Sequence, residues 1–287
     1  MIFAMDKVRI GVIGVGHLGA RHAKTYKEIS NCLLVGICDI NQGHLDEVSR
    51  SLSIPAFADY RRLLDKVDAV SIATPTKSHY EIAADCLKNK IHVLVEKPFT
   101  TNLREADRLI KIARRNNLIL QVGHIERFNP AFAATQKLIQ EPKFIECHRL
   151  SPFPNRSLDV GAVLDIMIHD IDIVLGLVPS PIKKIESVGI NVLTQFEDIA
   201  NARITFKNDC VANLTASRVS DEWMRKIRIF QKDTYISLDY KNALASVYKK
   251  DTAGISKEDL PIEKEESLQK ELDSFITCVI EHKTPLV

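Results

Sequence analysis

The sequence predicts an α/β protein of two domains: a doubly wound parallel sheet, then an α/β domain with an open, mainly antiparallel sheet. Three observations carry this prediction. Up to about residue 122, apolar strands alternate with amphipathic helices, as in a parallel sheet covered on both faces. A glycine-rich turn joins the first strand to the first helix. From residue 123 onward, strand-like segments follow one another with few helices between them, which favours antiparallel pairing. We place the domains at residues 1–122 and 123–287.

The glycine-rich turn lies between an apolar strand, Val8–Ile13, and a helical stretch, Ala20–Ile29. Its glycines have the spacing G-x-G-x-x-G. In dinucleotide-binding turns the first glycine permits the tight turn, the second lets the backbone approach a pyrophosphate, and the third lets helix and strand pack closely. The N–H groups of the first helical turn then face the phosphates. We expect a Rossmann domain whose turn contacts the cofactor through Gly14, Gly16, His17, Leu18 and Gly19.

An acidic residue completes this fingerprint. The second strand, Leu33–Cys38, ends at Asp39, 20 residues after Gly19. A carboxylate there accepts hydrogen bonds from an adenosine ribose and repels a 2′-phosphate. Arginine is absent from the sequence between Asp39 and Arg50. We therefore predict NAD rather than NADP as the cofactor. The alternative for the whole motif is a glycine-rich turn that binds no ligand.

The rest of the first domain continues the alternation. The expected strands are a short one near Ala56, Ala69–Ala73, Ile91–Val95 and Ile119–Val122. The expected helices are Gln42–Leu52, Tyr60–Leu64, Ser78–Asn89 and Leu103–Asn116. Ligands of such sheets bind beyond the carboxyl ends of the strands. Three of these strand ends run into polar turns: A-T-P-T, E-K-P and G-H. We expect all three to face the cofactor; the alternative for each is an ordinary polar loop. The cofactor contacts expected at these ends are Thr74, Pro75, His79, Glu96 and Lys97.

The second domain is predicted to be a run of strands interrupted by few helices. The expected strands are Phe144–Leu150, Ile185–Val192, Ile199–Phe206, Val211–Val219, Lys226–Gln231, Tyr235–Leu238 and Leu244–Tyr248. The expected helices are Val160–Leu177 and Leu268–His282. The charged segment Asp251–Glu266 is expected to be a solvated loop.

Lys97 is the first catalytic candidate, because it directly follows a buried strand and precedes a proline that biases its backbone toward an extended form. A lysine in a cleft can donate to a hydroxyl oxygen, or transfer a proton if its pKa is lowered. The alternative is a surface lysine paired with a carboxylate.

The second candidate is a polar stripe on the apolar helix Val160–Leu177. Asp165, His169 and Asp172 have the spacing i, i+4, i+7, which places them on one face. Histidine titrates near pH ~6.5 and suits a general base, while the aspartate one turn before it could orient it or bind a substrate hydroxyl. A solvated stripe is the first alternative. An N/O metal site that includes His124 is the second, but oxidising an alcohol with a nicotinamide needs no metal, so we predict none.

Composition excludes several classes of protein. The net charge is +2 with scattered basic residues, which gives no argument for nucleic acid or an anionic membrane. The segment Met1–Met5 is too short for a signal peptide, and the most apolar stretch, Val160–Val178, holds four ionisable groups. The six cysteines lack C-x-x-C spacing, which disfavours zinc ribbons and disulfide scaffolds. We expect a cytoplasmic protein with neither membrane nor nucleic-acid partners.

Together these motifs resemble the Gfo/Idh/MocA family of NAD(P)-dependent sugar oxidoreductases. The resemblance covers nearly the whole chain and rests on G-V-G-H-L-G, A-T-P-T with His79, E-K-P, and D-I-M-I-H-D-I-D at 165–172. It implies that Lys97 and His169, one from each domain, are catalytic, and that Asp165 helps hold the substrate. It also implies a homodimer or homotetramer built through the open sheet face.

Two segments, G-H-I-E-R-F-N-P-A at 123–131 and D-V-G-A-V-L-D-I-M-I-H-D at 159–170, resemble the branch that acts on UDP-N-acetyl sugars. Some members of this branch oxidise the 3-hydroxyl of UDP-N-acetylglucosamine. The resemblance then implies substrate contacts by His124, Arg127, Arg149, Arg156, Asp165 and His169, with the arginines as candidates for the diphosphate. Each arginine could equally form a surface salt bridge.

Three alternatives remain open: a cyclitol or free-sugar dehydrogenase, a sugar–sugar oxidoreductase with tightly held cofactor, and a nucleotide-binding regulator without turnover. Family members usually continue past a segment like Phe275–Val287 into a helix that returns to the first domain. The sequence given stops at Val287, so that further helix either lies outside it or is absent.

Overall fold

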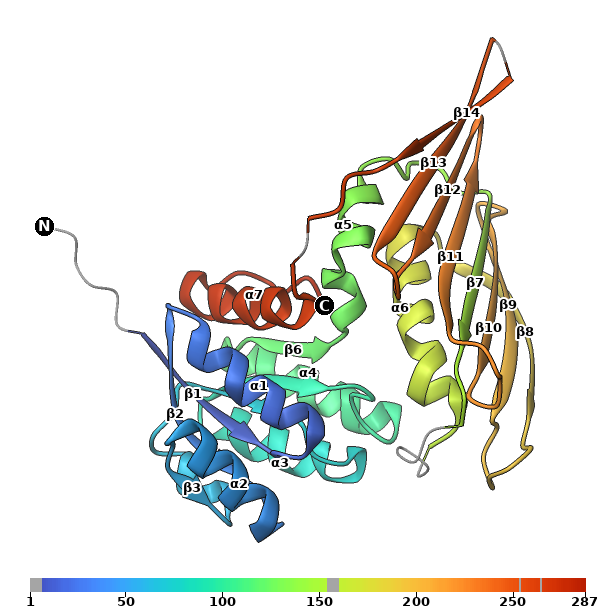
Figure 1. Cartoon of the computed structure of the whole chain (residues 1–287). Coiled ribbons are helices and arrows are strands. Elements are labelled where there is room, and N and C mark those ends of the chain that lie inside the picture. The colour runs from blue at the N-terminus through green and yellow to red at the C-terminus, as the bar shows by residue number, and fades with distance from the viewer. Residues whose placement is uncertain (1–6, 154–159, 253, 264) are drawn as a thin grey trace, which may run out of the picture. The chain divides into compact units, whose positions relative to one another are not determined.

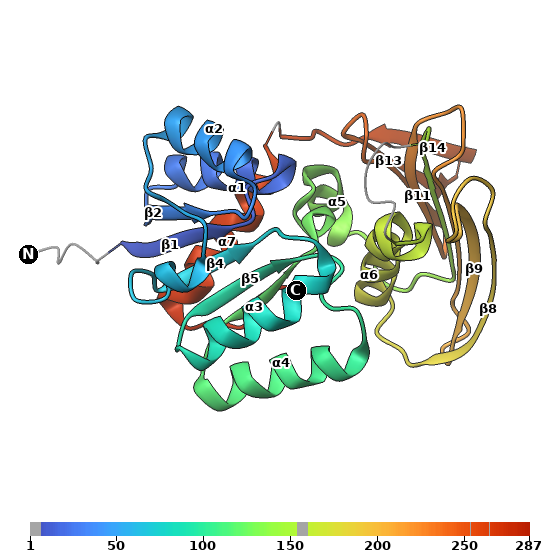
Figure 2. The same ribbon diagram turned by 90° about the horizontal axis from the view of Figure 1, so that it is seen from below.

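The computed structural model describes residues 7–153, 160–252, 254–263 and 265–287. They form two compact units. Unit 1 comprises the described residues up to Ile125 together with Ser267–Val287, and unit 2 comprises the described residues of Glu126–Glu266. Figures 1 and 2 show the elements of each unit.

Unit 1 is built on a parallel sheet with the strand order β3-β2-β1-β4-β5-β6. This order places the reversal of the winding between β1 and β4, where doubly wound sheets bind ligands. Its strands are β1 (Val8–Ile13), β2 (Cys32–Cys38), β3 (Ala56–Phe57), β4 (Ala69–Ile72), β5 (His92–Glu96) and β6 (Leu120–Gly123). Its helices are α1 (His17–Glu28), α2 (Gln42–Leu52), α3 (Thr76–Lys88), α4 (Leu103–Asn116), α7 (Ser267–Glu281) and a 3-10 turn, Tyr60–Leu63.

Helices cover both faces of this sheet, as predicted. The buried side chains of α1, α2 and α7 pack on one face, and those of α3 and α4 pack on the other (Figure 2). The ends of α4 show how local sequence sets an element. Asn102 caps its first turn by accepting a hydrogen bond from the Glu105 backbone N–H at 3.1 Å, and Asn117 ends it in the left-handed region.

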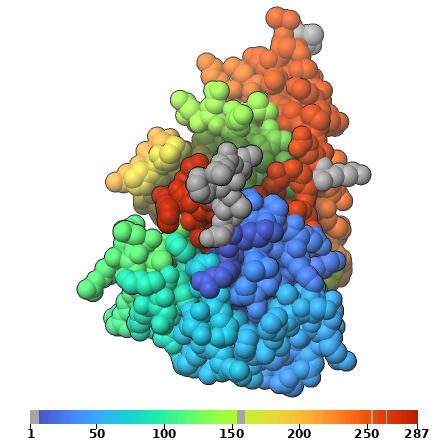
Figure 3. All heavy atoms as spheres, turned by 90° about the vertical axis from the view of Figure 1, so that its left-hand side faces the viewer, coloured from blue at the N-terminus to red at the C-terminus, as the bar shows by residue number. Residues whose placement is uncertain are grey.

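The C-terminal helix corrects the predicted domain division. Residues 123–287 were assigned to the second domain, but α7 packs against α1 and β1 in unit 1 (Figures 1 and 3). The physical reason is its apolar stripe, in which Leu268, Leu272, Phe275 and Ile276 are buried in the core that β1 and α1 share. This helix is the one predicted over Leu268–His282, and it returns the chain to unit 1.

Unit 2 holds a mixed, mainly antiparallel sheet with the order β14-β13-β12-β11-β7-β10-β9-β8. Only the β7–β10 pair is parallel among the described strand pairs of this sheet. The strands are β7 (Phe144–Leu150), β8 (Ile182–Ile190), β9 (Ile199–Phe206), β10 (Val211–Ser217), β11 (Met224–Gln231), β12 (Thr234–Asp239), β13 (Leu244–Asp251) and β14 (Gly254–Asp259). A 3-10 turn, Ile125–Phe128, leads from β6 to α5, and the helical segments are α5 (Pro130–Gln136), a π-helical turn, Val163–Met167, and α6 (Ile168–Leu177).

Two further predictions for unit 2 need correction. The segment Asp251–Glu266 is not a loop throughout, because it contains β14, an edge strand that pairs with β13. All six residues of β14 are exposed, so its sequence, G-I-S-K-E-D, shows no alternation of buried apolar and exposed polar residues. The helix predicted over Val160–Leu177 begins with a π turn rather than an α turn. None of the helices among the described residues has the length and apolar composition of a membrane span.

Candidate active site

The glycine turn has the geometry that a dinucleotide requires. Gly14 has φ +85°, and a Cβ there would lie 2.7 Å from the Ala73 carbonyl oxygen. A Cβ at Gly19 would lie 1.8 Å from the Gly14 carbonyl oxygen. At both glycines, therefore, neighbouring backbone occupies the space that a side chain would need. Around Gly16, by contrast, a Cβ would meet nothing within 4 Å. The backbone at Gly16 therefore borders open space, as the approach of a pyrophosphate needs.

Asp39 lies at the end of β2, beside the glycine turn. Its carboxylate accepts hydrogen bonds from the Val15 backbone N–H at 2.7 Å and from the Asn41 backbone N–H at 2.8 Å. These bonds fix the carboxylate in place. A carboxylate offers about four lone-pair sites, so these two hydrogen bonds leave Asp39 able to accept further ones from ribose hydroxyls.

A cavity of about 730 Å³ in unit 1 brings several predicted cofactor residues together. It is lined by Gly14, Gly16, Asp39, Thr74 and Pro75. The residues Tyr60 and Arg61, which the sequence analysis did not single out, line it as well. The predicted residues His17 and Leu18 lie in the first turn of α1, exposed and half-buried respectively.

His79 is buried, and its ring joins two of the strand-end turns. Its Nδ1 lies 2.9 Å from the Pro98 carbonyl oxygen and its Nε2 lies 2.7 Å from the Thr74 carbonyl oxygen. One ring thus links the turn after β4 to the turn after β5.

Glu96 and Lys97 form the end of β5, and their side chains differ in environment. The Glu96 carboxylate is buried and accepts from the Lys97 backbone N–H at 3.2 Å, while its other oxygen lies 3.2 Å from His22 Nε2. A Cβ at Gly123 would lie 2.7 Å from that carboxylate, so glycine lets β6 pass. Lys97 is half-buried, as is His124 at the end of β6.

In unit 2 the catalytic candidates lie on the π turn and α6. Asp165 is on the π turn, whose wider ring is closed by the Ile168 backbone N–H donating to the Val163 carbonyl oxygen. His169 and Asp172 are on α6, and all three side chains are half-buried. A π turn holds more residues per turn than an α turn, so the straight α-helical stripe that the spacing predicted does not apply to this turn.

Arg149, a predicted substrate contact, lies in a buried ion-pair network. It is 4% exposed and donates to both Asp170 oxygens, at 3.1 and 2.9 Å, and to Glu126 at 2.8 Å. Burial alone would lower the pKa of Arg149, but the two carboxylates outweigh it and raise that pKa. Sequence reasoning missed Asp170 and Glu126. The available signal was Asp170 itself, an acid on the apolar side of an amphipathic helix, which needs a buried cation.

The other two predicted arginines differ from Arg149. Arg127 donates to the Asp172 carboxylate at 2.6 and 3.1 Å and to the Asp172 carbonyl oxygen at 2.8 Å. Arg156 lies outside the described residues. Among the residues that the structure does describe, no group of three or more histidine, cysteine or acidic side chains is arranged to hold a metal ion.

The glycines provide a test that separates folding from cofactor binding. We expect Gly16→Ala to leave the melting temperature nearly unchanged but to abolish detectable NADH binding, because its methyl group would enter the open space in which we predict the pyrophosphate. Gly19→Ala, matched in chemistry, should lower the melting temperature, because its Cβ meets backbone at 1.8 Å. Thermal unfolding and NADH fluorescence titration measure both effects. A Gly16→Ala variant that binds NADH like the wild type would refute this assignment.

Comparison with known proteins agrees with this geometry. A model described as "Oxidoreductase family, NAD-binding Rossmann fold" matches residues 8–124, and one described as "GFO/IDH/MocA C-terminal domain" matches residues 135–236. The chain is 39% identical to UDP-N-acetylglucosamine 3-dehydrogenase of Acidithiobacillus ferrooxidans, with 97% of this chain and 91% of that protein covered. A solved structure of that enzyme has a TM-score of 0.92 over 98% of this chain and 91% of its own.

A more distant relative has a different substrate in its name. The chain is 30% identical to myo-inositol 2-dehydrogenase of Thermotoga maritima, with 74% of this chain and 69% of that protein covered. The sequence similarity to both enzymes extends over more than two thirds of each. This chain therefore belongs to the Gfo/Idh/MocA family of oxidoreductases with an NAD-binding Rossmann fold.

Proposed function

We propose that this protein oxidises a secondary hydroxyl of a UDP-linked N-acetylhexosamine, the 3-hydroxyl of UDP-N-acetylglucosamine, with NAD as its cofactor. The observation that carries the proposal is the 39% identity to UDP-N-acetylglucosamine 3-dehydrogenase over 97% of the chain. The cavity at the glycine turn supports the proposal, because Gly16 and Asp39 both line this one cavity.

In unit 1 the glycine turn would hold the pyrophosphate, and Asp39 would accept hydrogen bonds from the ribose. Thr74 and Pro75 line the same cavity and would contact the cofactor from the end of β4. Bound NAD⁺ supplies the hydride acceptor. His79 and Glu96 are buried and bond to the backbone of the strand-end turns, so we assign them the task of holding these turns in position.

The proton chemistry falls to Lys97 and His169. Oxidation of an alcohol builds a carbonyl as the hydroxyl proton leaves, so a base must reach that proton and a cation favours the developing negative oxygen. We assign the first task to His169 and the second to Lys97. Asp165 orients His169 or accepts a hydrogen bond from a substrate hydroxyl.

We assign Arg149 and Arg127 structural roles in place of the predicted diphosphate contacts. Arg149 donates to two buried carboxylates, and Arg127 is held by Asp172. Arg156 remains the proposed diphosphate contact, with His124 as a further substrate contact. We also propose a cytoplasmic location, which six free, buried cysteines support.

The proposed function is tested by calorimetry and turnover assays with NAD present. We expect UDP-N-acetylglucosamine to bind and to produce NADH, and free N-acetylglucosamine to do neither. The relative from Thermotoga maritima makes an inositol dehydrogenase the second candidate. Turnover of myo-inositol, without binding of UDP-N-acetylglucosamine, would favour that candidate and leave the family assignment intact.

The open face of the unit 2 sheet supports a homo-oligomer. An aromatic ladder of Phe144, Phe230, Tyr235 and Tyr248 crosses four strands of this face, with ring centroids 5.7, 4.7 and 4.8 Å apart. Their sequence neighbours, such as Ile229 and Ile236, are buried on the opposite, helix-covered face. We propose that a second copy covers the ladder.

The oligomer can be tested by light scattering. We expect a mass that is a multiple of 32.3 kDa, and we expect Tyr235→Lys to shift it toward 32.3 kDa, because a charge in the ladder opposes burial. Lys257→Ala, an exposed change on β14, is the control. A wild-type mass of 32.3 kDa at micromolar concentration would contradict the proposal.

A further inference from the structure

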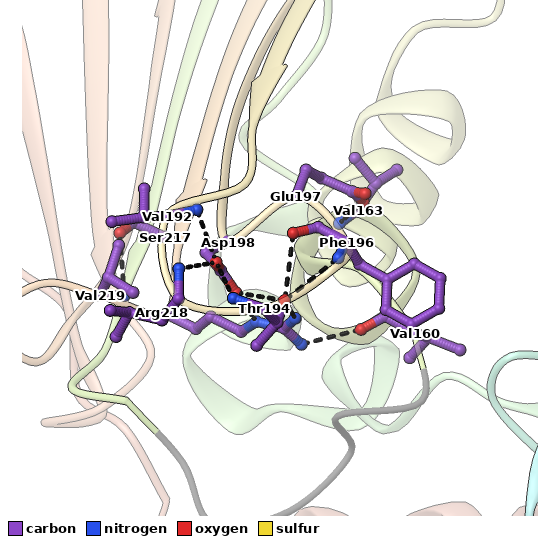
Figure 4. A network of polar contacts seen from close by, with 11 residues as sticks. Val160, Val163, Val192, Thr194, Phe196, Glu197, Asp198, Ser217, Arg218 and Val219 are labelled. Atoms are coloured by element: carbon purple, nitrogen blue, oxygen red, sulfur yellow. Dashed lines mark hydrogen bonds and ion pairs between the residues drawn. The ribbon is translucent and has the colours of Figure 1, made fainter.

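A buried polar cluster lies where three segments of unit 2 meet: the loop between β8 and β9, the residue after β10, and the chain that leads into the π turn. Figure 4 shows the cluster. We call it the Arg218 cluster and define it by Val160, Thr194, Glu197, Asp198 and Arg218. None of these residues was singled out by the sequence or used in the proposed chemistry.

Asp198 organises the loop between β8 and β9. One of its oxygens accepts hydrogen bonds from three successive backbone N–H groups at 2.8, 2.6 and 2.9 Å, those of Val192, Leu193 and Thr194. Its other oxygen accepts from the Thr194 hydroxyl at 2.8 Å and from Arg218 Nε at 2.9 Å. Burial alone would raise the pKa of Asp198, but these hydrogen bonds outweigh it and lower that pKa well below its usual range.

Arg218 extends this organisation to the chain before the π turn. Its side chain is fully buried. One terminal nitrogen donates to the Val160 carbonyl oxygen at 2.8 Å, and the other donates to the Thr194 hydroxyl at 2.9 Å. A single guanidinium therefore links all three segments, as Figure 4 shows. Breaking such a buried network leaves an uncompensated charge, which is strongly destabilising.

Glu197 makes the connection to the π turn itself. Its carboxylate accepts from the Val163 backbone N–H at 3.1 Å, and its carbonyl oxygen accepts from the Ala162 backbone N–H at 2.8 Å. A Cβ at Gly161 would lie 2.0 Å from this carboxylate, so the carboxylate packs directly against the chain. The Gly161 carbonyl oxygen in turn accepts from the Asp165 backbone N–H at 2.9 Å.

The first N–H groups of a helix have no partner within the helix and need one from outside. Here a neighbouring loop supplies it. Short π-helical turns are uncommon and occur frequently at functional sites. The position of this π turn is therefore set by Glu197 from across the fold, in addition to its own sequence.

We propose that Glu197, held in place by the Asp198–Arg218 pair, is a positioning residue for Asp165. It fixes the π turn so that Asp165 presents its carboxylate to the sugar and to His169. The proposal deepens the proposed function and rests on it for the identity of the sugar. The part played by the Arg218 cluster in holding the π turn does not depend on which sugar binds.

The test compares Glu197→Ala with Glu197→Gln in the full chain. Glu197→Ala removes the acceptor for Val163, whereas Glu197→Gln retains an acceptor oxygen of similar reach. Both leave the buried Asp198–Arg218 pair intact, so both variants should fold. Gln195→Ala, an exposed change in the same loop, is the matched control.

For Glu197→Ala we expect kcat/KM for UDP-N-acetylglucosamine to fall by about 10²-fold, the loss typical of a misplacement of about 1 Å. The KM for the sugar should rise and the pH profile of kcat should shift, because Asp165 faces both sugar and His169. The dissociation constant of NADH should stay unchanged. Glu197→Gln should restore the kinetic values and the pH profile. A merely structural role would lower the melting temperature without moving the KM or the pH profile.

Amide hydrogen exchange supplies a readout that needs no substrate. The amides of Ala162 and Val163 should exchange faster in Glu197→Ala than in the wild type, and not in Gln195→Ala. If the wild type fails to turn over UDP-N-acetylglucosamine, the proposed function is wrong, and the exchange rates still decide whether Glu197 anchors the turn. Unchanged exchange rates, or faster exchange with an unchanged KM and pH profile, would overturn the positioning role.

Discussion

Lys97→Ala and His169→Ala are each expected to lower turnover by about 10²–10⁴-fold, the usual contribution of a general acid or base. The reason is that the reaction develops negative charge on an oxygen while its proton departs. His169→Ala removes the proposed base, and Lys97→Ala removes the proposed cation. The dissociation constant of NADH should change much less, because the phosphates and the ribose are assigned to the glycine turn and Asp39. Steady-state rates and NADH fluorescence titrations measure both quantities.

Two further variants sharpen this comparison. His169→Gln keeps a hydrogen-bonding side chain that cannot titrate, so it should be nearly as inactive as His169→Ala. Lys77→Ala, an exposed change at the start of α3, should retain full activity. Turnover within about tenfold of the wild type in both alanine variants would exclude the assigned roles. A wild type that binds NADH but oxidises no sugar alcohol would favour the alternative of a nucleotide-binding regulator.

The sequence predicted unit 1 well because its signals are local. A strand, a glycine turn and a helix follow one another within about twenty residues, and each glycine has a steric reason that any chain shares. The structure accordingly begins β1 at Val8 and ends it at Ile13, as predicted, and places Asp39 beside the turn. For unit 2 the succession of strand-like segments predicted a mainly antiparallel sheet, and the family resemblance implied the same.

What the sequence could not predict depends on contacts between distant residues. Arg149 pairs with Asp170 and Glu126, 21 and 23 residues away, and no local pattern shows that all three are buried. Glu197 lies 34 residues from the Val163 backbone that it supports. The same holds for α7, since an amphipathic helix shows which of its faces is apolar but not which sheet it will cover.

A second large effect is expected from Glu271, on α7 in the core of unit 1. Its side chain is fully buried, and neither carboxyl oxygen has a hydrogen-bond partner among the described residues. Burial, together with the nearby Glu96 carboxylate, raises the pKa of Glu271 well above its usual value. The folded chain therefore holds a proton on Glu271 at a pH where the unfolded chain has lost it.

The sign of the resulting pH dependence follows from proton binding. The folded state binds the extra proton above the unfolded pKa of about 4.3, so the free energy of unfolding falls by up to ~1.4 kcal/mol per pH unit as pH rises toward the folded pKa. Glu271→Gln is neutral and similar in shape, so it should match the wild type below about pH 4 and exceed its stability increasingly up to pH 8. Each kcal/mol corresponds to about 2–4 °C in melting temperature.

Thermal unfolding between pH 4 and pH 8 measures this difference between Glu271→Gln and the wild type. Glu281→Gln, an exposed change on the same helix, is the control, since Glu281 pairs only with Lys283 in the ion pairs of the described residues and should show no such trend. A stability difference that stays constant with pH would mean that Glu271 titrates alike in both states. A wild type that is more stable than Glu271→Gln at pH 8 would mean that the buried carboxylate is ionised and paired in the folded chain.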